Sequence, residues 1–75
     1  MQEIIIEGIY RHHKNQNYKV LHVARHSENL EELVVYQKLY GDMSVWVRPL
    51  NMFLDKIEKS DGSIVNRFTY IGMEE

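Results

Sequence analysis

The stretch LVVYQKLYGDMSVWVR, residues 33–48, carries two alternating runs around a short polar interruption. If Gly41-Asp42-Met43 is a three-residue hairpin loop, Lys38 lies opposite Trp46. Side chains alternate between the two faces of a strand. With this single pairing register, the residues of both runs therefore separate into two consistent faces. One face collects Leu33, Val35, Leu39, Val45 and Val47, and the other collects Val34, Tyr36, Lys38, Tyr40, Trp46 and Arg48. The pattern predicts a β-hairpin.

A helix over residues 29–41 is the alternative for the first of these runs. Asn29 would cap it, Glu32 would occupy its third position and Gly41 would end it. One side of this helix would carry Leu30, Leu33, Val34, Gln37 and Tyr40. We favour the strand, because valine and tyrosine prefer sheets and because the two runs agree in register.

A second hairpin is predicted upstream, where Lys14-Asn15-Gln16-Asn17 separates IYRHH from YKVLHVAR. Asparagine tolerates a positive φ, which a tight turn requires. With Asn15-Gln16 as the turn, His13 faces Tyr18. One face then holds Ile9, Arg11, His13, Tyr18, Val20, His22 and Ala24, and the other holds Tyr10, His12, Lys19, Leu21, Val23 and Arg25. Neither face is cleanly apolar, so the inward face stays undecided.

The rest of the chain supplies a short helical turn and a last strand. Pro49 ends the second hairpin, since it lacks the N–H that a ladder needs. PLNMFLDKIE predicts a short helical or 3₁₀ segment, Ser60-Asp61-Gly62-Ser63 a turn, and residues 65–71 a closing strand. Residues 1–7 form an N-terminal arm or edge strand. This order predicts an all-β fold, an SH3-like barrel of about five strands.

Length and composition bound what such a chain can do. Its 75 residues suffice for one domain, residues 1–75, and the absence of Cys excludes disulfides and thiolate zinc sites. Such composition fits a reducing cytoplasm, where we expect the protein to reside. A net charge of −2 gives no global reason to bind nucleic acid. The apolar runs are far shorter than the roughly 20 residues that cross a bilayer, so we expect no membrane contact.

Several pieces of the chain, in order, resemble a known bacterial family. They are Gly8-x-Tyr10-Arg11-His12, Ala24-Arg25-His26-Ser27-Glu28, Leu33-Val34-Val35-Tyr36, Leu39-Tyr40-Gly41, Trp46-Val47-Arg48-Pro49-Leu50-x-Met52-Phe53 and Arg67-Phe68. Together they look like the domain of unknown function DUF1653 and cover residues 8–71. Asn15 stands where a turn glycine is expected. The resemblance implies a small bacterial all-β module, and it supplies no catalytic residues.

Arg25-His26-Ser27-Glu28 has residue types used in nucleophilic catalysis. Serine catalysis needs a base within hydrogen-bond reach of the hydroxyl. Neighbours on an extended strand point to opposite faces, so His26 and Ser27 diverge. We therefore interpret the segment as a strand end and turn. A small enzyme using Arg25, His26 and Glu28 remains an alternative.

The histidines and paired acids do not predict a metal or acid–base site. Zinc sites want three or four converging ligands, whereas the adjacent His12 and His13 should face opposite sides. Glu31-Glu32 and Glu74-Glu75 have no apolar pocket implied around them, so we interpret them as solvated charge. We expect no metal and no cofactor.

The strongest candidate for function is the second face of the 33–48 hairpin. Its aromatic side chains interleave with cations, and if exposed they supply stacking area and hydrogen-bond donors. The candidate ligand-binding residues are Arg25, His26, Tyr36, Lys38, Tyr40, Trp46 and Arg48. We predict a non-enzymatic module that binds a protein or peptide, with single-stranded nucleic acid as the alternative. In the structural alternative, Tyr36 and Trp46 cap the barrel or pack beneath PLNMF, and the stems of Lys38 and Arg48 cover ring faces.

Overall fold

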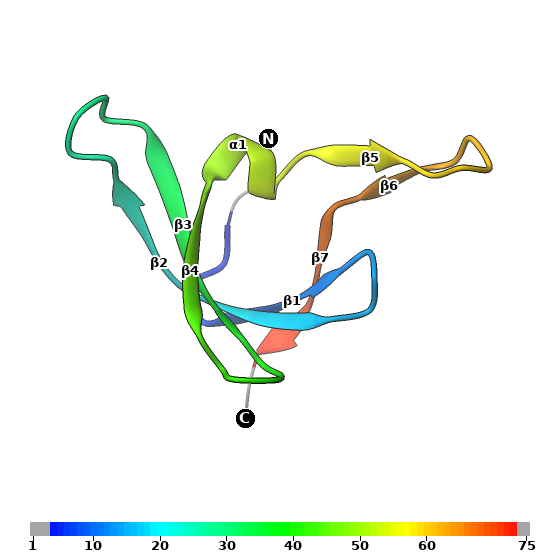
Figure 1. Cartoon of the computed structure of the whole chain (residues 1–75), viewed down its shortest axis with the longest axis horizontal. Helices are drawn as coiled ribbons and strands as arrows, with labels where there is room; N and C mark the ends of the chain where they lie inside the picture. Colours follow the sequence, from blue (N-terminus) through cyan, green and yellow to red (C-terminus); the bar gives the residue numbers. More distant parts are fainter. Residues whose placement is uncertain (1–3, 74–75) are drawn as a thin grey trace.

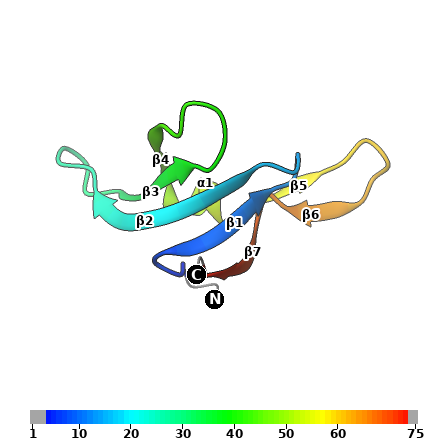
Figure 2. The same ribbon diagram turned by 90° about the horizontal axis from the view of Figure 1, so that it is seen from below.

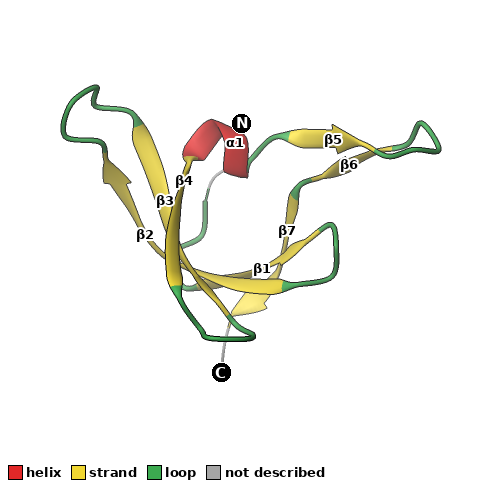
Figure 3. Ribbon diagram, in the orientation of Figure 1, coloured by secondary structure: helices red, strands yellow, loops and turns green. Residues whose placement is uncertain are grey.

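Seven short strands and one helical turn follow one another along residues 4–73, the part of the chain that this computed structural model describes (Figure 3). The elements are β1 (Gly8–His12), β2 (Asn17–Arg25), β3 (Glu32–Lys38), β4 (Val45–Pro49), α1 (Leu50–Phe53), β5 (Lys56–Glu58), β6 (Ile64–Asn66) and β7 (Phe68–Met73). The all-β prediction is confirmed, and residues 32–38 form a strand, not a helix.

Five strands form one antiparallel sheet in the order β4-β3-β2-β1-β7, while β5 and β6 form a separate hairpin that projects from it (Figure 1). The chain reaches β7 through this projecting hairpin and adds it beside β1. As a result, β4 and β7 lie at opposite edges of the sheet. The sheet formed by residues 4–73 therefore does not close into a barrel, and the predicted barrel is not confirmed.

Two β-bulges bend the sheet. The pairing of β2 with β3 shifts between Val20 and His22, and that of β1 with β7 shifts between Ile9 and Tyr10. A bulge adds a residue to one strand and increases its local twist. β2 consequently runs as one long curved strand across the molecule (Figure 2). The curvature gives the sheet a concave face, and the core lies there.

The core is mostly aromatic. Its buried members are Tyr10, Val20, Val34, Tyr36, Phe53 and Phe68. Phe53, from α1, stacks on Phe68 with ring centroids 4.1 Å apart and planes 4° apart. Tyr10 meets the Phe53 ring edge-on at 5.3 Å. Burial of a side chain of this size stabilises a fold by about 2 to 3 kcal/mol, so α1, although only four residues long, is energetically important.

The predicted register of the first hairpin is wrong. The structure pairs Tyr10 with Tyr18, not His13 with Tyr18. His12 donates its N–H to the Gln16 carbonyl at 2.7 Å, and Asn15 has φ 68°, so the loop spans three residues ending in a left-handed Asn15. The resulting shift is odd and exchanges the faces of β1 relative to β2. Tyr10 and His12, rather than Ile9 and Arg11, therefore share the inner face with Tyr18.

The second hairpin forms with a two-residue shift. Trp46 pairs with Tyr36, not with Lys38, and the loop extends from Leu39 to Ser44. A shift of two residues preserves the faces of the strands. The predicted register is therefore wrong, but the predicted faces are confirmed for the residues of β3 and β4, and the set that contains Val34 and Tyr36 is the inner one. Leu39 and Tyr40 belong to the loop and to neither strand face.

The segment after Pro49 differs in part from the prediction. Only Leu50–Phe53 is helical, Lys56–Glu58 is a strand, and the predicted last strand is divided into β6 and β7 at Arg67. The predicted turn is confirmed, since Asp61 Oδ1 accepts the Ser63 N–H at 2.9 Å and Gly62 has φ 89°. No helix among residues 4–73 is long and apolar enough to cross a membrane.

Residues 4–7 form an arm, not an edge strand. Ile4 packs against the core, the Ile5 N–H donates to the Tyr10 hydroxyl at 3.0 Å, and the Glu7 N–H donates to the Val20 carbonyl at 2.7 Å. At Gly8, a Cβ would lie 2.8 Å from Tyr70 Cε1 and 2.9 Å from the Ile5 carbonyl oxygen, so any side chain there would force these atoms to shift. The rest of the predicted arm, residues 1–3, lies outside the described residues.

Candidate functional site

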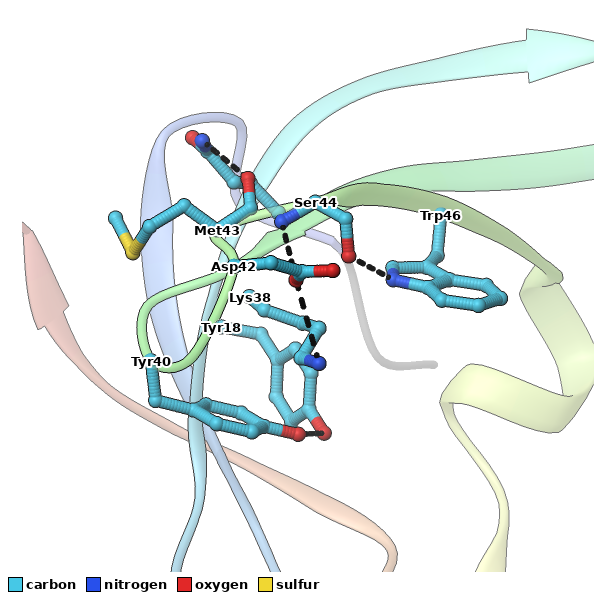
Figure 4. A network of polar contacts seen from close by, with 8 residues as sticks. Tyr18, Lys38, Tyr40, Asp42, Met43, Ser44 and Trp46 are labelled. Carbon is cyan, nitrogen blue, oxygen red and sulfur yellow. Dashed lines mark hydrogen bonds and ion pairs between the residues drawn. The ribbon is translucent and has the colours of Figure 1, made fainter.

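Five side chains line a pocket of about 170 Å³ next to the β3–β4 loop, and Figure 4 draws all of them except Tyr36. They are Tyr18, Tyr36, Lys38, Tyr40 and Trp46. We call this site the tyrosine pocket. It contains four of the seven residues predicted from the sequence, and it adds Tyr18.

Cross-strand pairing brings these side chains together. Tyr18 of β2 pairs with Lys38 of β3, and Tyr36 of β3 pairs with Trp46 of β4. Directly opposed residues on antiparallel strands place their side chains on the same face. Three neighbouring strands therefore supply four walls of the tyrosine pocket, and Tyr40 in the following loop closes it (Figure 4).

The hydroxyls of Tyr18 and Tyr40 form a hydrogen bond at 2.7 Å, with their rings edge to face at 5.6 Å. Burial raises the pKa of Tyr18, and the hydrogen bond with Tyr40 raises it further. The Tyr18 phenol therefore stays neutral. Only one of the two hydroxyl protons is used between them, so the pair has a further donor and acceptor for a ligand.

Lys38 places a cation at the wall of the pocket. Its Nζ lies 4.8 Å from the centre of the Tyr40 ring and 3.5 Å from Asp42 Oδ1. Hydrogen bonds from Ser44 lower the pKa of Asp42, which is therefore ionised at neutral pH. The aspartate offsets part of the ammonium charge, and the pocket is only weakly cationic.

Trp46 provides an aromatic surface that is open to solvent. Its side chain is 54% exposed, and its indole N–H donates to Ser44 Oγ at 2.7 Å. The Ser44 N–H in turn donates to Asp42 Oδ1 at 3.1 Å. The loop thus fixes the orientation of the indole while leaving the ring accessible, as an interface aromatic residue requires.

Tyr36 and Arg48, the other predicted members of this face, belong largely to the core side. Tyr36 is 6% exposed, with its ring 5.6 Å from that of Phe53. The Arg48 guanidinium lies 5.6 Å over the Phe68 ring, and its buried Nε has no hydrogen-bond partner. The inner face of the 33–48 hairpin is therefore buried at Tyr36 and exposed at Trp46.

Arg25 and His26 lie at the far end of β2, away from the tyrosine pocket. Arg25 pairs with Glu32 at the start of β3, whereas Tyr18 pairs with Lys38 at its end. His26 Nδ1 accepts the Glu28 N–H at 3.1 Å, and the His26 carbonyl accepts the Leu30 N–H at 2.9 Å. The segment is an exposed polar turn, and the structure does not bring these two residues to the other five.

Sequence reasoning missed Tyr18, together with Asp42 and Ser44, which orient Lys38 and Trp46. The predicted register of the first hairpin differs from the observed one by an odd number of residues. It therefore placed Tyr18 on the same face as Ile9 and not with Tyr10. The signal that would have found it is Asn15, because a single left-handed residue ending a three-residue loop fixes the observed pairing.

Other hollows lie elsewhere on the surface. One, of about 310 Å³, is lined by the core side chains Tyr10 and Phe68 and by partly buried or exposed neighbours. Another, of about 240 Å³, is lined by Glu31 and Glu32 with Leu50 and Asn51, although no pocket was expected around these paired acids. A further one, of about 260 Å³, contains His12 and His13, whose rings lie 4.2 Å apart although they were predicted to face opposite sides. His13 belongs to the loop, so strand alternation does not apply there. Residues 4–73 contain no cluster of three His, Asp or Glu side chains that could hold a metal ion.

The fold and the pocket define a small antiparallel β domain with an aromatic site on its concave face. Comparisons with known proteins agree with this class. The family model described as protein of unknown function (DUF1653) matches residues 8–70. A crystal structure of a DUF1653 protein from Bordetella bronchiseptica is 32% identical, has a TM-score of 0.82, and covers 95% of this chain and 92% of its own. The chain belongs to the DUF1653 family. No curated protein matched it.

Proposed function

We propose that this domain is a non-enzymatic module that binds an extended segment of a partner protein at the tyrosine pocket. The observation that carries the proposal is the half-exposed indole of Trp46 beside the Tyr18 and Tyr40 hydroxyls and the Lys38 ammonium. Rigid aromatic side chains supply contact area at low conformational cost, and they dominate binding energy at interfaces.

The size of the pocket indicates the kind of ligand. At about 170 Å³ it is smaller than the roughly 300 to 1,000 Å³ of pockets that enclose small molecules. It accommodates one side chain of a larger partner. Because the Tyr18 phenol is neutral and Asp42 offsets part of the charge of Lys38, an uncharged side chain suits the pocket better than a charged one. The concave, aromatic face follows the layout of SH3-like grooves, although the sheet is open.

A peptide selection tests this proposal. Peptides are selected from a random displayed library on the full chain, labelled with a fluorophore and then titrated with the protein while their fluorescence anisotropy is recorded. We expect Trp46→Ala and Tyr40→Ala to weaken binding about tenfold or more. Ile64→Ala, in the projecting hairpin and similarly exposed, should bind as wild type. Peptides that bind both pocket variants as tightly as wild type would refute the proposal.

Single-stranded nucleic acid is the second candidate, favoured by the cations around the histidine hollow. Arg11 and Lys59 line it. Lys14 and Arg67 also lie close enough to lower the pKa of His13, after the larger effect of burial. Titration with a single-stranded oligonucleotide tests this candidate. An affinity that falls steeply with salt would favour it over the peptide.

A further inference from the structure

β4 is an edge strand whose free side can be identified from its hydrogen bonds. It pairs with β3 alone among the strands of residues 4–73. The Lys38 N–H donates to the Ser44 carbonyl at 2.9 Å, and bonded and non-bonded pairs alternate along an antiparallel ladder. Trp46 and Arg48 therefore bond to β3, while Val45 and Val47 point their N–H and C=O groups outward. Pro49 follows in an outward position, where its missing N–H leaves the ladder intact.

The side chains of β4 leave this edge open to another strand. Val45 and Val47 are 54% and 58% exposed on the outer face, and Trp46 is exposed on the inner one. Protein edges are usually protected from pairing by charges, bulges or irregular strands. β7, the other edge, has a bulge opposite β1 and a positive φ of 137° at Gly72. β4 pairs regularly with β3 over five residues and carries no charge before Arg48.

We propose that the partner segment docks as an added strand along β4. This inference rests on the proposed function and specifies its geometry. Opposed side chains of the two strands share a face, so alternate residues of the segment meet the two valines and should be apolar. Those between them lie on the inner face, where one reaches the tyrosine pocket beside Trp46.

The charge of Arg48 favours an acidic residue in the partner segment, in addition to its alternating apolar residues. Arg48 is the next inner-face residue of β4 after Trp46. It makes no ion pair within residues 4–73, its guanidinium covers the Phe68 ring, and its Nε lacks a partner. An Asp or Glu two residues from the pocket-filling side chain would lie beside this arginine. The occupant is therefore an extended protein segment with alternating apolar residues and one carboxylate.

The experiment uses the best peptide from the selection, synthesised with an N-methyl group at one backbone position at a time. An added strand donates every second N–H to β4, so affinity should fall about tenfold at alternate positions and little at those between. Val47→Pro removes a donor that faces outward and leaves the bonds to β3 intact, so the variant should fold and bind about tenfold more weakly. Val47→Ala keeps the donor and is the matched control.

The outcomes separate the two proposals. A methylation profile without alternation, with Trp46→Ala still weakening binding, overturns the added strand and leaves the proposed function standing. If neither Trp46→Ala nor Tyr40→Ala weakens peptide binding, the added strand and the proposed function are both overturned. If Val47→Pro does not fold, the methylation series alone decides. A dimer of this chain that is lost in Val47→Pro, and that peptide does not displace, would assign the edge to a second copy and also overturn the inference.

Discussion

His12 illustrates how a single residue couples the core of this domain to pH. Its ring meets Phe68 edge-on at 5.0 Å, and its Nδ1 accepts the Lys14 N–H at 3.2 Å. Burial lowers its pKa from 6.5 to about 4, and the charges of His13, Arg48, Arg67 and Lys14 act in the same direction. The folded protein therefore holds His12 neutral under conditions in which the unfolded chain protonates it.

This difference in the protonation of His12 between the folded and unfolded states predicts that acid begins to destabilise the fold at pH values above those at which carboxylates titrate. Between pH 6.5 and about 4 the unfolded state binds the extra proton, so stability is complete above this window and falls as pH falls through it. Because the ring is partly exposed, we expect a loss of about 1 to 2 kcal/mol. Urea denaturation at pH 7 and pH 4.5 measures it. His12→Gln should flatten the profile, and an unchanged slope in that variant would assign the effect to other groups.

The two hairpins show which features of an element can be predicted from sequence. Alternation over residues 33–48 identified both strand faces correctly, because the register was misjudged by two residues and the faces survive an even shift. At the first hairpin the error was odd, so Tyr18 was assigned to the wrong partners and the tyrosine pocket was incomplete. The length of each hairpin loop could not be predicted from residue types alone, because it depends on the backbone conformation of residues such as Asn15.

Asn15 gives a direct test of that loop. Its φ of 68° is one that glycine adopts without strain and alanine does not. We expect Asn15→Ala to lower the free energy of unfolding by about 1 kcal/mol, and Asn15→Gly to leave it unchanged or raise it by a few tenths of a kcal/mol. Chemical denaturation of the three proteins measures both changes. Equal stability of the alanine and glycine variants would contradict a left-handed residue at this position.

The β5–β6 hairpin was not predicted because strands of three residues show no detectable periodicity. A tertiary contact outside the strands holds it in place. Arg67 Nε donates to Asp55 Oδ1 at 2.6 Å, and the Arg67 N–H donates to the Asp55 carbonyl at 3.1 Å. The two ends of the hairpin are joined by this pair, whose partners lie twelve residues apart and are not recognisable as neighbours in the sequence.

At the scale of the whole molecule, the chain has a small core for its extent. Its radius of gyration is 12.7 Å, against about 11 Å for a compact globule of this length. Projecting hairpins account for the excess (Figure 1). Only six side chains are buried among residues 4–73, so the domain should have little stability to spare.

A core and a pocket substitution should consequently behave very differently. Phe53 is fully buried, and Phe53→Ala should cost about 3 to 5 kcal/mol, enough to unfold most of the population at ambient temperature. Trp46→Ala should cost about 1 kcal/mol, because over half of that side chain is already in water. Circular dichroism during thermal unfolding measures both. If Trp46→Ala unfolds the protein, the indole is a structural residue and the tyrosine pocket loses its main binding surface.

The position of Pro49 sets a limit on how tightly anything can hold the β4 edge. Before Pro49, only Val45 and Val47 direct their backbone groups outward. An added strand could therefore bond to four groups, the N–H and C=O of each valine, and would then reach a proline that has no N–H to donate. A ladder this short yields a few kcal/mol at most, which implies residence times far below those of permanent complexes. This ladder is also too short to support open-ended edge-to-edge association of many copies of the chain. If a partner strand docks along β4, the same proline that ends β4 therefore limits how long that strand stays bound.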